Sequence, residues 1–255
     1  MYPILFSFGK LTIFSYGLFY ALALFTSITY LSNQLKKSKE KLFSQDKLYS
    51  LCLYIIIFEV FGARLFFVLT NSQYFILTPL DIFKVWEGGL VYYGGLIFAA
   101  LFLLVYVRVK KISILDLGDF FAPALALGHA IGRIGCFFAG CCYGKETNVP
   151  WSVVFKDKNS LAVIGVHLHP TQLYEAFGNF LIFILLYFYS KKEYKRGIIL
   201  AIYFILYAVL RFIVEFFRGD SERGVQYFGL SISQVVSIFL FIIGVFILCK
   251  NKKKK

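Results

Sequence analysis

Four polar side chains recur at helical spacing inside one long apolar stretch of the chain. They are Tyr207, Arg211, Glu215 and Arg218, which follow one another at steps of four, four and three residues. This spacing places all four on one face of a helix, with aliphatic and Phe side chains on the other faces. Since the planar fork of arginine binds phosphate oxygens in bidentate fashion, this face is suited to holding an anion such as a lipid phosphate.

A second apolar stretch carries a similar set. His129 and Arg133 are four residues apart and Cys136 follows three residues later, so the three share a helical face. Histidine has an intrinsic pKa suited to proton transfer near neutral pH. Two interpretations of His129 stay open: a proton acceptor beside Arg133, or a histidine bonded to a neighbouring helix.

Charged side chains within apolar stretches need partners or a wet cavity, because each one near a bilayer centre costs at least about 2.5 to 3.5 kcal/mol on insertion scales. The arginines in or beside these stretches are Arg64, Arg133, Arg211 and Arg218, and the glutamates are Glu59, Glu175 and Glu215. One interpretation is a set of interhelical ion pairs, in which Glu59 and Arg64, five residues apart, bond to different neighbours. The other is an anionic ligand, which the surplus of arginine favours for Arg133, Arg211 and Arg218.

The composition indicates the elements that must position these groups. The chain has 255 residues and is 59% hydrophobic, against about 45 to 50% in soluble domains, which argues against a water-soluble fold. Its net charge of +13 lies in short clusters between apolar runs, so a nucleic-acid partner is not expected. A bilayer core needs about 20 apolar residues per helix. Seven such runs occur, at residues 13–32, 48–70, 91–109, 120–140, 171–189, 198–217 and 231–249.

These runs predict an all-α, polytopic membrane protein with seven transmembrane helices in a single integral-membrane domain, residues 1–255. Most of the 27 Lys and Arg residues follow the first, third, fifth and seventh runs. Because short cytoplasmic loops carry the excess of Lys and Arg, the N-terminus is expected outside and the C-terminus in the cytoplasm. Residues 141–169 then form an outer-face loop and residues 250–255 a basic cytoplasmic tail.

Glycines and cysteines gather near the expected outer ends of the runs. Gly94, Gly95 and Gly144 could expose backbone N–H groups to an anion or let helices pack closely, and the sequence leaves both interpretations open. The cysteines are Cys136, Cys141 and Cys142. The adjacent pair lacks the spacing typical of zinc ligands, a disulfide is possible in an oxidising compartment, and packing of small side chains is the preferred interpretation.

Seven motifs together resemble one known family from end to end. They are PxxFSxG at residues 3–9, SYGLFY at 15–20, GARL at 62–65, WEGGLVYYGGL at 86–96, GRIGCF at 132–137, HPTQLYE at 169–175 and RFIVEFFR at 211–218. In this order they resemble the bacterial prolipoprotein diacylglyceryl transferases. The resemblance implies a multi-pass protein of the bacterial cytoplasmic (inner) membrane. It also implies transfer of the diacylglyceryl group of phosphatidylglycerol to the lipobox cysteine in the signal peptide of a prolipoprotein, forming a thioether and releasing glycerol 1-phosphate, with no metal or organic cofactor.

The resemblance also assigns site residues. Arg133 and Arg211 match the two essential arginines, and they are suited to stabilising the departing phosphate. The predicted catalytic residues are these two arginines, Tyr93 at the position of a family histidine, and His129, which is added only because of its spacing to Arg133. The predicted substrate-binding residues are Tyr16, Gly94, Gly95, Cys136, Gly144, Tyr207, Glu215 and Arg218.

Three positions depart from the family pattern. Tyr93 stands where the family usually has His, Cys136 where it usually has Asn, and Cys141 where it usually has Glu. A phenol is a poor base at neutral pH, so the acceptor of the thiol proton is left open.

Two rival functions also stay open: a divergent paralogue acting on another acceptor, and a lipid or anion transporter using the same arginine-lined cavity.

Overall fold

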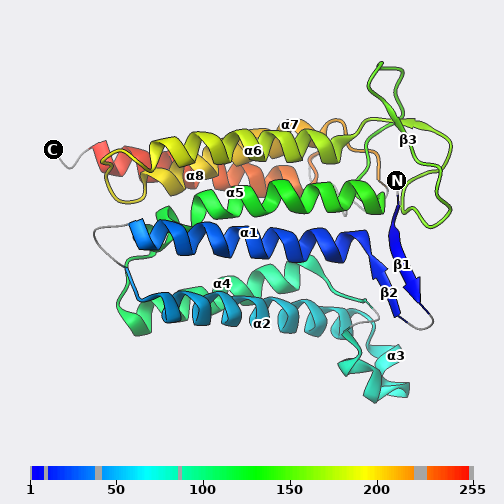
Figure 1. Cartoon of the computed structure of the whole chain (residues 1–255), viewed down its shortest axis with the longest axis horizontal. Helices are drawn as coiled ribbons and strands as arrows, with labels where there is room; N and C mark the ends of the chain where they lie inside the picture. The colour runs from blue at the N-terminus through cyan, green and yellow to red at the C-terminus, as the bar shows by residue number, and fades with distance from the viewer. Residues whose placement is uncertain (1, 9–10, 38–41, 86–87, 221–228, 253–255) are drawn as a thin grey trace. The chain divides into compact units, whose positions relative to one another are not determined.

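The structure is a computed structural model that describes residues 2–8, 11–37, 42–85, 88–220 and 229–252. Figure 1 shows that most of these residues are helical. Several basic residues used to predict topology lie outside the described residues: Lys10, Lys39, Lys41, Arg223 and residues 253–255. So do Trp86 and Glu87 of the fourth motif. The chain divides into a larger compact unit, Met1–Leu31 with Gly118–Lys255, and a smaller one, Ser32–Leu117.

The larger unit begins with an antiparallel hairpin and contains five of the long helices. The hairpin pairs β1 (Ile4–Phe8) with β2 (Leu11–Phe14). The helices are α1 (Ser15–Lys37, as far as Leu31), α5 (Ile114–Ala139, from Gly118), α6 (Thr171–Tyr189), α7 (Ile198–Glu215) and α8 (Ile232–Lys252). The hairpin is tied to the start of α1, since the backbone N–H of Ser15 donates to the carbonyl of Pro3 at 2.9 Å.

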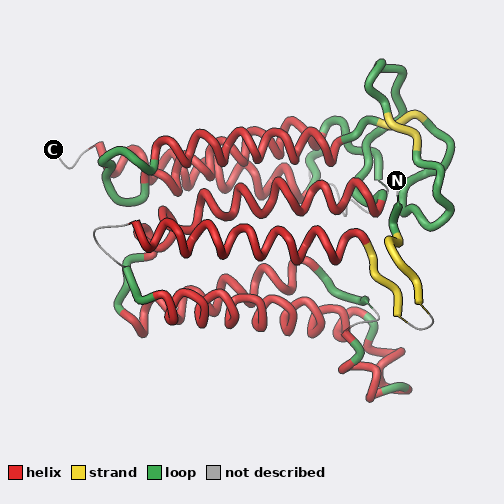
Figure 2. The backbone as a smooth tube through the Cα atoms, viewed as in Figure 1, coloured by secondary structure: helices red, strands yellow, loops and turns green. Residues whose placement is uncertain are grey.

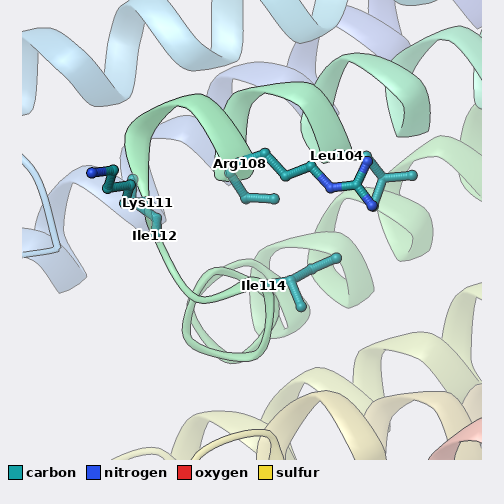
Figure 3. Close-up of a pocket in the computed structure, with 6 residues that line it drawn as sticks. Leu104, Arg108, Lys111, Ile112 and Ile114 are labelled. Atoms are coloured by element: carbon teal, nitrogen blue, oxygen red, sulfur yellow. The ribbon is translucent and has the colours of Figure 1, made fainter.

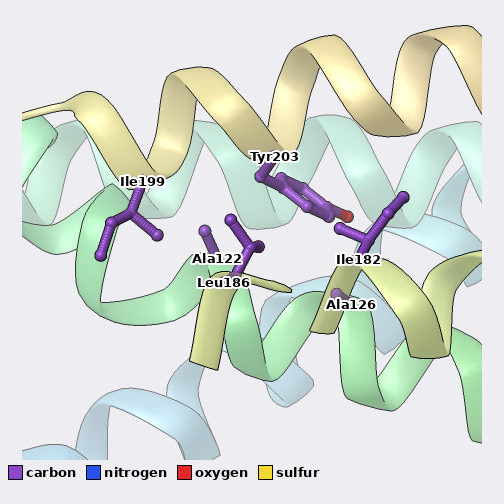
Figure 4. Close-up of a cluster of buried hydrophobic side chains, with 6 residues drawn as sticks. All are labelled: Ala122, Ala126, Ile182, Leu186, Ile199 and Tyr203. Atoms are coloured by element: carbon purple, nitrogen blue, oxygen red, sulfur yellow. The ribbon is translucent and has the colours of Figure 1, made fainter. Parts of the chain in front are cut away.

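Small and aliphatic side chains bring α5, α6 and α7 together (Figure 4). The buried cluster consists of Ala122 and Ala126 from α5, Ile182 and Leu186 from α6, and Ile199 and Tyr203 from α7. Asp119 fixes the start of α7 from a neighbouring helix, because its carboxylate accepts from the backbone N–H of Gly197 at 2.5 Å and of Leu200 at 2.8 Å. A buried carboxylate at a helix N-terminus satisfies free N–H groups and complements the helix dipole.

The connection between α5 and α6 folds over the ends of these helices. It contains two short antiparallel strands, β3 (Val153–Val154) and β4 (His167–Leu168), around a small core of Phe155, Ala162 and Leu168. Figure 2 shows both strand pairs at the same end of the larger unit's helices. The predicted loop at 141–169 therefore has some ordered structure of its own.

The smaller unit is built on two long helices that pack through glycine. It contains α2 (Gln45–Thr70), α3 (Ser72–Leu77), the 3₁₀ helix η1 (Pro79–Phe83) and α4 (Tyr92–Lys110). A Cβ on Gly62 would lie 2.5 Å from the carbonyl oxygen of Gly94, and a Cβ on Gly94 would lie 2.5 Å from that of Gly62. A cavity of about 330 Å³ lies at the end of α4, lined by Leu104, Val107, Arg108, Lys111, Ile112 and Ile114 (Figure 3).

Every predicted run contains a long helix among the described residues, but the runs differ in apolarity. Six helices, α2, α4, α5, α6, α7 and α8, are long and apolar enough to cross a membrane, by length and composition. The chain is therefore an all-helical, polytopic membrane protein. Among the described helices α1 falls outside this set, because its 23 residues include several Ser, Thr and Tyr side chains. It begins at Ser15 because the two residues before it belong to β2.

Candidate active site

Glu175 of α6 joins the two predicted catalytic arginines. Its Oε2 pairs with Nε of Arg133 on α5, and its Oε1 lies 3.0 Å from Nη1 of Arg211 on α7. The side chains are 14% exposed for Arg133, 10% for Arg211 and 2% for Glu175. The two guanidinium groups therefore converge on one buried carboxylate, as two charges held in an apolar surrounding require.

Arg211 has two further partners. Its Nη1 lies 2.7 Å from Oε2 of Glu215, one turn along α7, which agrees with the shared face predicted from their spacing. Its Nη2 donates to the hydroxyl of Ser233 on α8 at 2.8 Å. The sequence reasoning missed Ser233, because a single serine at the start of an apolar run carries no sign of its partner.

Arg218 is held by Asp220 just beyond the end of α7. Its Nε donates to Oδ1 of Asp220 at 2.8 Å, and Nη2 pairs with Oδ2. Burial opposes the charge of Arg218, but the hydrogen bonds to Asp220 and the nearby Cys142 raise the pKa of its guanidinium above the ordinary value. The sequence count omitted Asp220.

The sequence predicted more arginines than acidic partners. This prediction is wrong for the described residues, because Arg133, Arg211 and Arg218 each have an acidic partner.

Arg64 of α2 binds backbone instead of acid. Its guanidinium donates to the carbonyls of Asp81 at 2.5 Å, Ile82 at 2.9 Å, Gly88 at 2.7 Å and Gly89 at 3.1 Å. These bonds satisfy its charge-assisted donors and tie the segment before α4 to α2. Its role in the structure is therefore to hold this segment in place.

His129 lies beside the arginine pair. Its ring stacks on that of Tyr207 on α7, with centroids 5.1 Å apart and planes 29° apart, and Tyr207 in turn stacks on Tyr203 at 5.7 Å. His129 is also close enough to Arg133 and Arg211 for electrostatic interaction. The structure thus brings His129 and Tyr207 to the candidate site, and both interpretations of His129 are compatible with this position.

Tyr16 approaches the same region from the start of α1. It is 47% exposed and stacks on Tyr20 with centroids 6.4 Å apart. Its phenol interacts electrostatically with Cys136 and Arg133. The close approach of α1 depends on Gly135, where a Cβ would lie 2.8 Å from the Cβ of Phe19.

The remaining predicted glycines pack against backbone. A Cβ on Gly95 would lie 2.9 Å from the carbonyl oxygen of Glu59, and Gly94 contacts Gly62 as described above, so both favour the helix-packing interpretation. Tyr93, in the first turn of α4, is 43% exposed, with its ring 5.6 Å from that of Tyr92. These three residues belong to the smaller unit, and their contact with substrate stays a prediction.

Gly144 holds two loops of the larger unit together. Its backbone N–H donates to the carbonyl of His169 at 3.0 Å, and it forms an isolated β-bridge with Arg218. A Cβ here would lie 2.4 Å from both the Cβ and the carbonyl oxygen of His169. Gly144 therefore helps to position Arg218 through the backbone.

The three cysteines form one cluster at the end of α5. The sulfur atoms of Cys136, Cys141 and Cys142 all lie within 4.8 Å of one another. All five cysteines of the chain lie among the described residues and are free thiols. Hydrogen bonds from Cys136 and Cys141 lower the pKa of the Cys142 thiol, with smaller contributions from Arg133 and Arg218, whereas the same hydrogen bonding raises that of Cys141.

An apolar groove lies along one face of α7, beside the start of α6. It has a volume of about 520 Å³ and is lined by Val149, Trp151, His169, Tyr174, Leu210, Ile213, Val214 and Phe217. Two hydrogen bonds fix its polar edge: the indole N–H of Trp151 donates to the hydroxyl of Tyr174 at 2.7 Å, and that hydroxyl lies 3.1 Å from Nδ1 of His169. Leu210, Val214 and Phe217 share a face of α7 about 100° away from the face of Arg211 and Glu215, so the groove offers an apolar surface on the same helix as the charged groups.

Comparison with known proteins identifies the family of this chain. The family model described as prolipoprotein diacylglyceryl transferase matches residues 3–250. The chain is 36% identical over 255 residues to a phosphatidylglycerol-prolipoprotein diacylglyceryl transferase of Clostridium tetani, covering 100% of both proteins. It is 34% identical over 244 residues to phosphatidylglycerol-prolipoprotein diacylglyceryl transferase 2 of Clostridium perfringens, covering 96% of this chain and 93% of the relative.

A third relative is a phosphatidylglycerol-prolipoprotein diacylglyceryl transferase of Finegoldia magna. It shares 38% identity over 221 residues, which cover 86% of this chain and 84% of that protein. Because the family match extends over nearly the whole chain and these relatives align along most or all of it, the chain belongs to the prolipoprotein diacylglyceryl transferase family.

Proposed function

We propose that this protein transfers the diacylglyceryl group of phosphatidylglycerol to the lipobox cysteine thiol of prolipoproteins. A bond forms between the thiol sulfur and a glyceryl carbon, the bond from that carbon to the phosphate oxygen breaks, and glycerol 1-phosphate leaves. The observation that carries this proposal is the convergence of Arg133 and Arg211, from two different helices, on one buried carboxylate. The family membership established above supports it.

Arg133 and Arg211 bind the phosphate in this proposal. A guanidinium has five N–H donors, more than one carboxylate can accept at once. Glu175 therefore fixes the direction of both groups and leaves donors for a headgroup. Donors that are already oriented stabilise the leaving phosphate without reorganising during the reaction. Glu215 pairs with the same Nη1 of Arg211 as Glu175 does, and Ser233 accepts from Nη2.

The other predicted residues have supporting roles in this proposal. Tyr16, Tyr207, Cys136 and Arg218 line the substrate site around the arginine pair. His129 accepts the thiol proton if a side chain does so directly, with Tyr93 as the alternative. The groove bounded by Trp151 and Tyr174 accepts an apolar part of a substrate.

In the proposed topology, α1 also crosses the membrane, which brings the number of transmembrane helices to seven. Near its start, Tyr16 interacts electrostatically with Arg133 of the candidate site. The N-terminus then lies outside the bacterial inner membrane, the basic clusters lie in the cytoplasm, and residues 141–169 cover the site on the outer side. This places the site at the leaflet where a secreted precursor emerges.

A transfer assay tests the proposal directly. The purified protein is incubated with phosphatidylglycerol vesicles and a lipobox peptide, and the peptide is examined by mass spectrometry. We expect a mass increase of one diacylglyceryl group with wild type and a loss of at least about 100-fold with Arg133→Gln or Arg211→Gln. Arg108→Gln, at the exposed end of α4, is the matched control and should retain activity.

Folded protein that does not modify the peptide would overturn the proposal. Modification of a different thiol-bearing acceptor in the same assay would favour the paralogue. Movement of labelled lipid across proteoliposomes without any peptide product would favour the transporter.

A further inference from the structure

The three clustered thiols have the arrangement of a metal site. Cys136 lies in the last turn of α5, and Cys141 and Cys142 follow the end of that helix. Three sulfurs around a tetrahedral zinc ion, at about 2.3 Å each, lie about 3.8 Å apart. Since the sulfurs of the cluster are all within 4.8 Å of one another, modest side-chain rotations suffice to close them around one ion.

The backbone that brings these thiols together is fixed by buried side chains. The turn passes through Gly140 at φ 82° and Cys142 at φ 58°, a left-handed conformation that is disfavoured for a residue with a Cβ. Thr171 donates to the carbonyl of Cys142 at 2.8 Å, and Gln172 donates to that of Cys141 at 2.7 Å. Both donors are almost fully buried at the start of α6. The cluster is therefore built into the junction of two helices.

This arrangement was not visible in the sequence. Cys141 and Cys142 are adjacent in the sequence, and adjacent side chains in a helix or strand point in different directions, which is unfavourable for binding one metal ion. The left-handed turn reverses the direction of the chain and returns both thiols toward Cys136, one helical turn before the helix end. Cys136 from the helix is thereby combined with Cys141 and Cys142 from the turn.

The surroundings favour a negatively charged thiolate complex. Arg133 and Arg218 both interact electrostatically with Cys142. Three thiolates around a divalent zinc ion carry one net negative charge, which these guanidinium groups stabilise. Sulfur ligands select zinc and other thiophilic ions over magnesium and calcium, which prefer oxygen.

We propose that Cys136, Cys141 and Cys142 bind one zinc ion whose fourth position is open to the acceptor thiol. This inference rests on the proposed function, departs from the metal-free activity that the family resemblance implies, and supplies the means of activating that thiol. A thiol that coordinates zinc loses its proton, and three protein ligands with one open position are typical of catalytic zinc.

The step balances without any change of oxidation state. The acceptor thiol displaces a metal-bound water and releases its proton to solvent. A sulfur lone pair then forms the bond to the glyceryl carbon, and the electron pair of the breaking carbon–oxygen bond leaves with the phosphate. The thioether product is a weaker ligand than the thiolate, so it dissociates and water returns. The zinc ion thereby removes the need for a side-chain base to accept the thiol proton.

Metal binding is tested first, independently of activity. Co²⁺ is titrated into the purified, reduced protein in detergent, and the thiolate-to-cobalt charge-transfer absorption is recorded. Competition with Zn²⁺ then measures zinc affinity. We expect one equivalent bound by wild type, and loss of the charge-transfer band in Cys142→Ser and in Cys141→Ser. The double variant Cys52→Ser with Cys249→Ser removes the two cysteines outside the cluster and is the matched control, which should bind as wild type does.

Absence of the band in reduced wild type, or its persistence in Cys142→Ser, would overturn the site. So would a disulfide between two thiols of the cluster that persists in the titrated protein, seen as a mass 2 Da lower than that of the free thiols. A variant that unfolds is recognised from its thermal melt, and Cys141→Ser then provides the second test.

Activity is measured next on metal-free and zinc-loaded protein. We expect removal of zinc to lower the peptide transfer rate by about 100-fold or more, the size typical of losing proton transfer, and zinc to restore it. Zinc binding with equal transfer rates in both forms would overturn the thiol-activating role. Zinc binding with no transfer in either form would instead refute the proposed function while leaving the metal site intact.

Discussion

Replacing Glu175 by glutamine isolates the group on which both arginines converge. Gln has nearly the same shape as Glu but carries no charge. Arg211 keeps its pair with Glu215, while Arg133 loses the charge of its acidic partner in the described structure. Because breaking a buried ion pair costs about 3 to 5 kcal/mol when one charge is left without compensation, and the amide still accepts hydrogen bonds, we expect a loss of about 3 kcal/mol in the free energy of unfolding.

The effect on catalysis has a separate cause from the effect on folding. A displacement of about 1 Å in a positioning group can cost about 100-fold in rate. Without the shared carboxylate, Arg133 and Arg211 repel each other and lose their common direction. We therefore expect Glu175→Gln to lower kcat/KM by about 100-fold in the lipobox-peptide transfer assay, with the folded state checked by thermal unfolding in detergent.

Glu215→Gln is the matched control for this reasoning. It removes the same kind of charge from Arg211, but Glu175 still pairs with both arginines. The loss of one of the two ion pairs of Arg211 should leave kcat/KM less affected than in Glu175→Gln, because the shared carboxylate that directs both arginines remains. Folded Glu175→Gln with wild-type transfer, or a larger catalytic loss in Glu215→Gln, would refute the role of the shared carboxylate.

Three further predictions concern the elements around the site. Gly144→Ala places a Cβ 2.4 Å from the backbone of His169, so it should destabilise the fold by about 1 to 3 kcal/mol; thermal unfolding beside Gly132→Ala, whose Cβ meets nothing within 4 Å, measures this, and equal Tm values would contradict it. Asp119→Asn weakens the acceptor for two N–H groups of α7 and should cost about 1 kcal/mol, seen as a lower urea midpoint; an unchanged midpoint would show that the cap contributes nothing. Hydrogen bonds from Lys84 and Tyr74 lower the pKa of Asp81, so this contact stabilises above the unfolded pKa of about 3.9 and is lost as pH falls through the lower folded pKa. NMR titration should show the pKa rising toward its ordinary value in Lys84→Met, and no rise would argue against the pair.

The long helices could be predicted from the sequence because their signals are local. A bilayer sets the length of an apolar run, and the period of the helix sets which residues share a face. These two rules gave the six apolar helices and the shared face of Arg211 and Glu215. They did not give the start of α1, because Ile13 and Phe14 are as apolar in the β2 strand as they would be in a helix.

The partners of the charged groups could not be predicted in the same way. Glu175 was counted among the glutamates that could pair with arginine, but periodicity contains no information about which helix its carboxylate faces. Asp220 was omitted because it lies beyond the apolar run, yet two residues are enough to return it to Arg218. The cysteine cluster depends on the left-handed backbone conformation at Cys142, which a cysteine at that position does not predict.

In the proposed mechanism, the balanced charge around Arg133 and Arg211 also determines which state of the substrate the site binds most tightly. Glu175 and Glu215 already offset Arg133 and Arg211, so a phosphodiester with one negative charge gains only part of the attraction that two free arginines would offer. As the carbon–oxygen bond breaks, the phosphate acquires a second negative charge, and this added charge meets donors that are already oriented. Attraction that grows along the reaction coordinate lowers the barrier, whereas uniform attraction would only tighten binding of the lipid. The carboxylates that weaken lipid binding therefore help the site to favour the transition state, provided that they keep the two arginines directed at the same phosphate.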